Sequence, residues 1–227
     1  MSQLRLANPY PDNGFQAVDF KFNSPAQTTQ SLNGKVRRLG MGITYYTFTV
    51  KYPMVSRAKL STIMGFLSQC QGPLYAFDIV LPYISYTNLT NQISGSVSVT
   101  GGTDTWVENG VTKTGYKTGR GVVTVTGANG DLFAGGDVMR FEDYNFPGND
   151  PNSKHLKVYM VTNEVTITGG LGTVYFAGGL VDNVPNGTLV KYNAVPFQVI
   201  LNGEEQLFNV GTGGMGSLEF NCREVWG

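Results

Sequence analysis

The chain has 227 residues, enough for one large all-β domain or two small ones, and its sixteen basic and sixteen acidic residues cancel. Charged residues make up only 14%, aromatic residues reach 12%, and glycine contributes 30 residues. This composition indicates either a turn-rich β protein or a surface largely covered by neighbouring subunits, since interface cores are poor in charge and rich in aromatic rings. The sequence has no apolar run of about eighteen residues and no signal-peptide core, so we expect neither membrane insertion nor ordinary secretion.

Charge is unevenly placed along the chain. Residues 1–60 hold eight Lys or Arg and two acidic residues, and the rest of the chain carries the matching acidic excess of six. The basic surplus could neutralise the phosphates of a nucleic acid through Lys35, Arg37, Arg38 and Lys51. It could instead be a solvated face, or it could complement an acidic surface on an adjacent copy and fix the orientation of the two.

The N-terminal third predicts a strand followed by a long hairpin. Residues 15–22 alternate, with Val18, Phe20 and Phe22 on one face of the expected strand. Residues 23–42 are polar, and Asn33 followed by Gly34 is a strong hairpin-turn signal. We therefore expect a hairpin with its tip near these two residues, although a mobile loop is the alternative.

Residues 43–82 change their hydrophobic period from two to about 3.6 and back, which predicts a strand, a helix and a strand. Tyr46, Phe48 and Val50 alternate with polar residues in the first strand. A helix over residues 56–71 follows, with Ser56 as its N-cap and a stop at Gly72 and Pro73. Its apolar stripe must pack on the flanking strands; the stripe consists of Leu60, Ile63, Met64 and Leu67.

After residue 90 the sequence becomes rich in Thr, Ser, Gly and Asn, which indicates a small inserted β-domain over residues 91–192. Strand-like runs recur at a spacing typical of a small barrel or sandwich, at residues 121–126, 138–141, 156–162, 172–176 and 188–191. The chain then returns to a core domain made of residues 1–90 and 193–227. Of its two cysteines, Cys70 falls in the helix and Cys222 in the last strand, and we expect both to be reduced and buried.

Several segments, taken in order, carry a family resemblance. The strand reading YPM, the turn into SRA, the helix and the return through GPLYAF into LP resemble the tube-type domain of bacteriophage tail proteins, of the distal-tail or baseplate-ring kind. The stretch GDVMRF and the residues from HLKVYMVT to VPFQV resemble the small β-domain inserted in some of these proteins, and SLEFNCREVW resembles their final strand. Together these segments cover more than half of the chain.

The resemblance implies an all-β fold with one packed α-helix, in which a tail-tube-like β-barrel or sandwich carries the inserted domain. It also implies a virion protein, assembled in the host cytoplasm, that forms a ring of about six copies by closed head-to-tail contacts. Its partners would be itself, adjacent tail tube, hub or baseplate proteins, and genomic DNA in transit through the channel. The expected subunit contacts lie in the hairpin and the strand after it, at Asn33, Gly34, Lys35, Arg37, Arg38, Tyr45, Thr47, Thr49 and Lys51.

Residues with catalytic or metal-binding chemistry are scarce, so we expect no enzyme, cofactor or metal. His155 is the only histidine, and any Ser-His-Asp or Cys-His system would need it. One histidine and two distant cysteines do not make a tetrahedral zinc site. Asp143, Asn145 and Gly148 match an EF-hand loop, but the loop fails at its fifth and twelfth positions, which are Pro147 and Lys154.

Two further motifs also point away from a site. Gly211, Gly213 and Gly216 fit a dinucleotide fingerprint literally, but a strand pattern follows them where that motif needs a helix. The adjacent carboxylates Glu142–Asp143 and Glu204–Glu205 would point to opposite faces of a strand.

Two rival functions remain open on the sequence. A carbohydrate-binding or host-attachment module would use exposed rings such as Trp106, Tyr116 and Tyr144. A glycan-degrading enzyme would need two carboxyl groups facing one bond across several ångströms, which sequence alone does not reveal.

Overall fold

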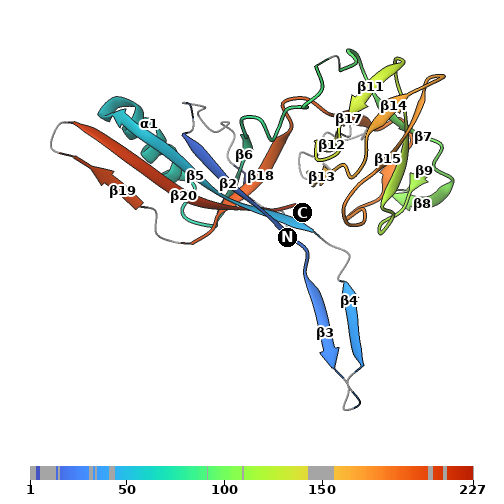
Figure 1. Cartoon of the computed structure of the whole chain (residues 1–227), viewed down its shortest axis with the longest axis horizontal. Helices are drawn as coiled ribbons and strands as arrows, with labels where there is room; N and C mark the ends of the chain where they lie inside the picture. The colour runs from blue at the N-terminus through green and yellow to red at the C-terminus, as the bar shows by residue number, and fades with distance from the viewer. Residues whose placement is uncertain are drawn as a thin grey trace.

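The computed structural model describes residues 4–5, 14, 16–30, 33, 35–40, 44–90, 92–108, 110–142, 156–203, 207–211 and 214–226. The fold is mainly β-sheet, and the described part of the chain contains a single short helix, as the sequence predicts. Figure 1 shows a large sheet with the helix, a second β unit beside it, and a hairpin that projects away from both.

The larger sheet is built from both ends of the sequence. Its strand order is β1, β6, β18, β20, β5 and β2, and β19 also pairs with β20. Neighbouring strands are antiparallel except β1, which runs parallel to β6. The bounds are Leu4–Arg5 for β1, Ala17–Asn23 for β2, Tyr45–Ser56 for β5, Tyr75–Val80 for β6, Pro196–Leu201 for β18, Leu207–Val210 for β19 and Met215–Glu224 for β20.

One face of this sheet is covered by the helix α1 (Arg57–Gln69), which follows β5 directly. Ser56 has the extended backbone of an N-cap, but its hydroxyl makes no capping hydrogen bond. The chain leaves the helix through Gln71 and Gly72, both with positive φ, a conformation that favours glycine at helix ends. The buried face of α1 consists of Leu60, Ile63, Phe66 and Leu67. Met64, which the sequence pattern placed on this stripe, is only partly buried.

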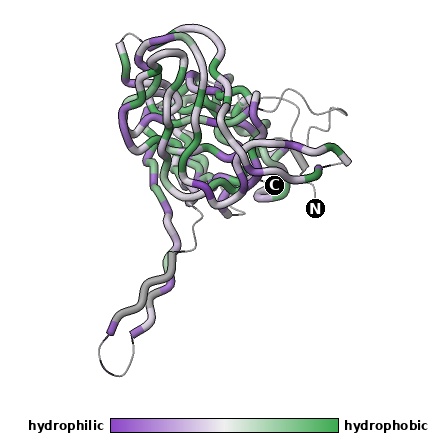
Figure 2. The backbone as a smooth tube through the Cα atoms, turned by 90° about the vertical axis from the view of Figure 1, so that its right-hand side faces the viewer, coloured by the Kyte–Doolittle hydropathy of each residue, from purple (hydrophilic) through white to green (hydrophobic). Residues whose placement is uncertain are grey.

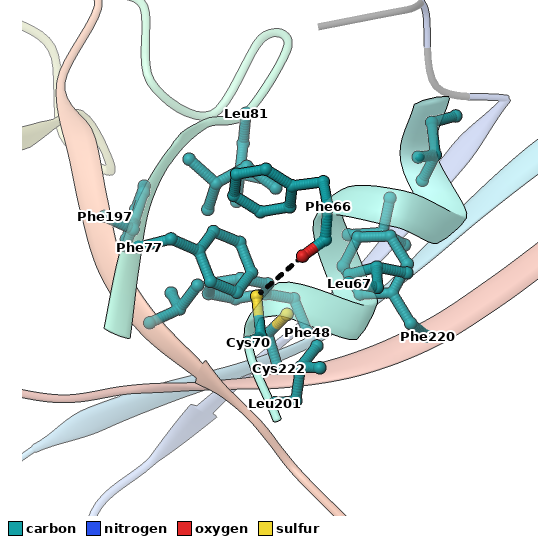
Figure 3. Packing of buried hydrophobic residues seen from close by; sticks show 14 of the residues in the cluster. Phe48, Phe66, Leu67, Cys70, Phe77, Leu81, Phe197, Leu201, Phe220 and Cys222 are labelled. Atoms are coloured by element: carbon teal, nitrogen blue, oxygen red, sulfur yellow. Dashed lines mark hydrogen bonds between the residues drawn. The ribbon is translucent and has the colours of Figure 1, made fainter. Parts of the chain in front are cut away.

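The core under the helix contains several aromatic rings in contact with one another. Phe66 of α1 meets Phe77 of β6 edge to face, with ring centroids 5.2 Å apart, and Phe48 meets Phe197 in the same way at 5.7 Å. Cys70 lies in this core, and its thiol donates to the carbonyl of Phe66 (Figure 3). In β5 half-buried and buried side chains alternate from Tyr45 to Tyr52, whereas β6 buries Ala76 and Phe77 in succession.

A second set of sheets takes all its strands from residues 98–191. The largest has the order β13, β12, β17, β7, β10 and β15, and a two-stranded and a three-stranded sheet lie beside it. The bounds are Ser98–Thr100 for β7, Asp104–Glu108 for β8, Val111–Tyr116 for β9, Val122–Thr126 for β10, Gly130–Phe133 for β11, Val138–Glu142 for β12, Val158–Met160 for β13, Val165–Ile167 for β14, Leu171–Tyr175 for β15, Val184–Pro185 for β16 and Leu189–Lys191 for β17.

Neither large sheet is a closed barrel, so the barrel form of the sequence prediction is not found. The larger sheet ends at β1 and β2, which have no strand beyond them among the described residues. In the second sheet the outer strands approach each other only at an isolated bridge between Val161 and Phe176. Each set of sheets has its own cluster of buried side chains, and Val138 and Val158 of the second set belong to the cluster of the first.

No helix in the described ranges is long and apolar enough to cross a membrane. Both cysteines are free and buried, as expected.

The buried thiols predict how stability responds to alkaline pH. Burial raises the pKa of Cys70 to about 12 and that of Cys222 well above its usual value of 9.0. The folded protein therefore keeps both protons where the unfolded chain loses them, so the free energy of unfolding falls as pH rises above 9. We expect this free energy to fall by about 1.4 kcal/mol per pH unit for each thiol.

Urea titrations of the wild type and a Cys70→Ala/Cys222→Ala variant between pH 8 and about pH 10 measure this effect. The buried tyrosines contribute equally to both proteins, so the difference in slope isolates the thiols. Identical slopes would show that the thiols do not control alkaline stability.

Candidate assembly surface

The hairpin of β3 (Ala26–Gln30) and β4 (Val36–Gly40) is the most isolated element of the described chain. Its two strands pair over five residues each and hydrogen-bond to no other strand in the described ranges. Ala26, Gln27, Thr29 and Gln30 are exposed. Figure 2 shows the hairpin extending well clear of the rest of the molecule. A lone two-stranded ribbon is only marginally stable in water, so a hairpin of this kind gains stability from a partner.

The predicted contact residues of the hairpin lie in its outer half. Asn33 is in the turn and Lys35 lies just before β4, both exposed. Arg37 and Arg38 are on β4, in register with Thr29 and Thr28. Gly34 lies outside the described residues.

The strand after the hairpin, where the resemblance places further subunit contacts along residues 43–51, is internal to the larger sheet. The backbone of β5 is paired on both sides, with β2 over residues 45–51 and with β20 over residues 47–56. Residue 43 lies outside the described residues. The order of strands in a sheet does not follow from hydrophobic alternation, so the sequence pattern could not identify β5 as a central strand.

Side chains of β5 nevertheless contribute to an open face of the sheet. Tyr45, Thr47, Thr49 and Lys51 are half-buried and share the face opposite the core. Their neighbours on β2 and β20 are polar and exposed, so this is a solvated sheet face, called the polar face below; the neighbours are Asp19, Lys21, Glu219, Asn221 and Arg223.

Charges on the polar face are partly paired. Lys51 Nζ lies 2.7 Å from Asp19 Oδ2, and this hydrogen bond lowers the pKa of Asp19 and raises the pKa of Lys51. Lys21 and Arg223 lie on opposite sides of Thr47 in the register, and neither forms an ion pair with a described residue. The end of the polar face nearest the hairpin is therefore cationic.

The free edge of the larger sheet next to the hairpin is β2. This strand pairs only with β5 among the described residues, and its apolar side chains sit at the margin of the core. Phe20 stacks on Tyr46 with ring centroids 4.9 Å apart, and Phe22 remains 43% exposed. An unpaired edge with exposed apolar side chains is a template for pairing with another strand. Among the described residues, the free strand edge next to the hairpin is therefore that of residues 17–23.

A buried ion pair joins the larger sheet to the second set of sheets. Lys157, just before β13, donates to Glu224 Oε2 of β20 at 2.5 Å, and both side chains are almost fully buried. Glu224 also accepts from the backbone N–H groups of Val158 and Tyr46, at 2.9 and 3.3 Å. The Lys157 ammonium lies 4.5 Å from the centroid of the Tyr46 ring. Burial raises the pKa of Glu224 and lowers that of Lys157, and their mutual attraction opposes both shifts.

Further contacts hold the two segments that connect the sheets. Asp137 is buried and accepts hydrogen bonds from the Thr87 hydroxyl at 2.6 Å, the Asn88 N–H at 3.2 Å and the Ala134 N–H at 2.8 Å. Arg140 donates to the carbonyl of Pro196 at 3.2 Å. Arg140 therefore binds the second set of sheets to β18 of the larger sheet, and Asp137 fixes the connecting segment at residues 87–88.

One partner of the ion pair, Glu224, leaves a signal in the sequence that our predictions did not use. Leu218, Phe220 and Cys222 alternate toward the core along β20, and Glu224 occupies the next position of the same parity. A carboxylate at a core position needs a buried partner, because an isolated buried charge is strongly unfavourable. The identity of that partner depends on long-range packing, which the pattern does not contain.

The catalytic and ligand-binding alternatives gain little from the described residues. His155, Asp143, Tyr144, Glu204 and Glu205 lie outside them, and the described part holds no group of three or more residues suited to a metal. Glu142 borders an open groove of about 680 Å³ lined mainly by residues 87–97 and 189–193, and no other described residue of its lining carries a carboxylate. Of the three glycines in the fingerprint, Gly213 lies outside the described residues, and the strand β20 follows the turn as the sequence predicts.

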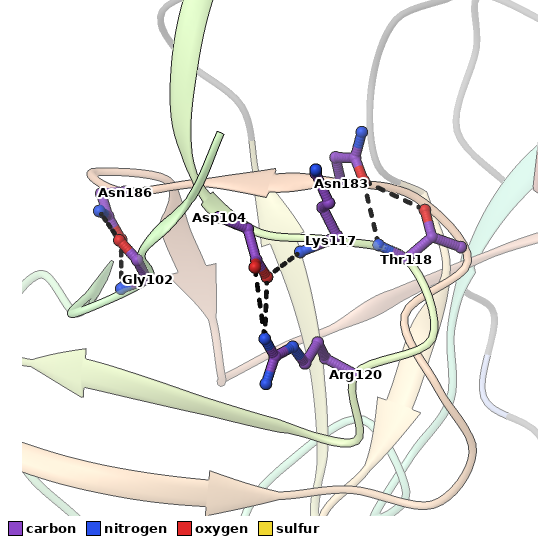
Figure 4. Close-up of polar contacts among 7 residues, drawn as sticks. All are labelled: Gly102, Asp104, Lys117, Thr118, Arg120, Asn183 and Asn186. Atoms are coloured by element: carbon purple, nitrogen blue, oxygen red, sulfur yellow. Dashed lines mark hydrogen bonds and ion pairs between the residues drawn. The ribbon is translucent and has the colours of Figure 1, made fainter. Parts of the chain in front are cut away.

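The aromatic residues considered for carbohydrate binding have partners of their own. The Tyr116 hydroxyl donates to the Thr100 carbonyl at 2.9 Å and accepts from the Thr124 N–H at 3.0 Å. The Trp106 indole donates to Glu108 at 3.3 Å. Neighbouring polar groups fix the hairpin of β8 and β9 to its surroundings, including Asp104 with Arg120 and Asn186 with Gly102 (Figure 4). These contacts give both rings a structural role.

Comparison with protein-family models finds no match to this sequence, and comparison with curated proteins finds no similar one.

The buried ion pair of Lys157 and Glu224, at the junction between the two sets of sheets, predicts a large loss of stability when one of its charges is removed. Glu224→Gln keeps the shape of the side chain but leaves the Lys157 ammonium buried without a counter-charge. We expect the free energy of unfolding to fall by about 3–5 kcal/mol. Urea denaturation followed by tryptophan fluorescence measures the change, since Trp226 lies 4.9 Å from the same ammonium.

Glu219→Gln, on the exposed face of the same strand, serves as the control and should change stability by less than about 0.5 kcal/mol. A Lys157→Met/Glu224→Gln variant should recover part of the loss, because it removes both charges together and keeps a side-chain oxygen that can accept a hydrogen bond from a backbone N–H. A loss below about 1 kcal/mol for Glu224→Gln would contradict the role assigned to the pair.

Proposed function

We propose that the chain is a structural subunit of a bacteriophage tail and assembles head to tail into a ring at the distal tail or baseplate. The observation that carries the proposal is the β3–β4 hairpin, which has exposed side chains on β3, pairs with no other strand in the described ranges and continues directly from the edge strand β2. This geometry gives one chain a strand edge and an arm that can reach a neighbour. The resemblance of the sequence to tail-tube proteins supports the same function.

In this proposal the arm and the edge perform different tasks. The hairpin crosses to the adjacent copy, and β2 offers its unpaired backbone groups to a strand of that copy. Contacts of this heterologous kind close into a ring when the rotation between copies divides a full turn, and about six copies follow from the resemblance. The polar face is suited to line a hydrated channel through which the genome passes.

The second set of sheets has a task of its own in the proposal. Because Lys157 and Arg140 bind it to strands of the larger sheet and Asp137 fixes one connecting segment, it can present a fixed surface to tail tube, hub or other baseplate proteins. Assembly in the host cytoplasm and residence in the virion follow from the same proposal. Catalysis has no place in it.

Two variants test the assembly. Replacing residues 26–40 with a short Gly-Ser linker removes the arm, and Phe22→Lys places a charge on the free edge. Both should reduce ring formation at least about tenfold, because edge charges oppose strand pairing. Light scattering after size-exclusion chromatography, with negative-stain imaging, measures the ring fraction.

Leu171→Lys is the matched control, since Leu171 is 52% exposed on β15, the edge strand of the second sheet. This variant should assemble like the wild type. Because some rings close only on a growing tail, virions carrying a tagged copy should be imaged as well. A protein that is monomeric in solution and missing from the tail would refute the proposal.

A further inference from the structure

A small crevice lies where the polar face meets the junction between the sheets. It has a volume of about 290 Å³ and is lined by Tyr45, Arg223, Glu224, Val225 and Trp226. This is below the usual range of small-molecule sites, about 300–1,000 Å³, and is suited to one or two side chains.

The carboxylate in the crevice wall is not available to a ligand. Glu224 is buried, and both of its oxygens are occupied by Lys157, Val158 and Tyr46. Its charge is balanced by the Lys157 ammonium 2.5 Å away. Glu224 therefore neither repels an anion in the crevice nor neutralises Arg223.

Arg223 is the exposed charge of the crevice. Its side chain forms no ion pair with any described residue, in contrast to Lys51 on the neighbouring strand, which is paired with Asp19. Lys21 lies across Thr47 from Arg223 and adds a second positive charge to this end of the polar face. A guanidinium in this position can donate hydrogen bonds to both oxygens of a carboxylate.

Two aromatic rings complete the walls. Tyr45 and Trp226 are both half-buried, and Trp226 is held by the Lys157 ammonium 4.9 Å from its ring centroid. Aromatic walls beside a guanidinium fit a side chain with an apolar stem and a carboxylate end, as in Glu or Asp. The partly apolar surroundings strengthen a charge-assisted hydrogen bond relative to one in open water.

We propose that this crevice receives an acidic side chain from a second copy of the same chain. The inference rests on the ring assembly proposed above and names one contact within it. A second copy can supply the opposite charge, because residues 61–227 carry an acidic excess of six, whereas Lys21 beside Arg223 belongs to the basic residues 1–60. A head-to-tail contact places different surfaces of identical copies together, so a cationic site on one copy can meet acidic residues of the next.

Arg223→Gln tests the charge without disturbing the core, because Arg223 is exposed. We expect the affinity between subunits to fall about tenfold to a hundredfold. The part of its salt dependence that comes from this contact should be mostly lost. Arg57→Gln is the matched control, an exposed arginine at the start of α1, and should associate like the wild type. Thermal unfolding of both variants should match the wild type.

Arg223→Lys identifies the partner residue directly. A water-soluble carbodiimide condenses a carboxylate with the new amine, forming an amide while the carbodiimide takes up the water as a urea. Rings assembled from equal amounts of ¹⁴N- and ¹⁵N-labelled Arg223→Lys protein should yield mixed-isotope cross-linked peptides that join this amine to an Asp or Glu. Those peptides should be absent when the same treatment is applied to Arg223→Gln.

The outcomes separate the two proposals. If the wild type forms rings and Arg223→Gln forms them equally well, or if the amine couples only within its own chain, the crevice contact is wrong and the ring remains. Coupling only to a different virion protein also overturns the contact between copies. If the wild type is absent from the tail, the proposed function and this contact fall together.

Discussion

The arrangement of the two sets of sheets depends on one buried ion pair, Lys157 with Glu224. Removing two charges from water is costly, and here the cost is offset by a 2.5 Å contact, two backbone N–H donors to the carboxylate and an aromatic ring below the ammonium. Each donor comes from a different part of the chain, so the pair is satisfied in one arrangement only. A purely apolar contact would be as stable and less selective, because it tolerates sliding.

This constraint explains the contrast between the rigid and the projecting parts of the molecule. Asp137 and Arg140 hold the two connecting segments, and Val138 and Val158 extend the core of the larger sheet into the second set. The hairpin has no comparable support among the described residues. A firmly docked body with one unsupported arm is the form expected of a subunit whose last contacts are made by its neighbours.

Local patterns in the sequence were sufficient to predict the helix and the strands, but they did not show which strands lie next to each other in a sheet. The strand, helix and strand of residues 43–82 were predicted because α1 must bury one stripe and β5 must bury alternate residues, and both periods are visible in the sequence. The position of β5 between β2 and β20, and therefore the location of the free edge, depends on pairing across the whole chain. Glu224 was detectable as a core position, whereas Lys157 precedes a short strand and carries no periodic signal.

The central pairing of β5 with β20 has a consequence for folding. Thr49 and Asn221 are bonded neighbours that are 172 positions apart in the chain. Closing so long a loop is slow unless the intervening chain is already compact, so the second set of sheets should form first and shorten the search. Until β20 arrives, one side of β5 stays unpaired and open to the wrong strand. Misassembly during synthesis is therefore expected to begin at β5, a strand whose backbone is paired on both sides in the folded molecule.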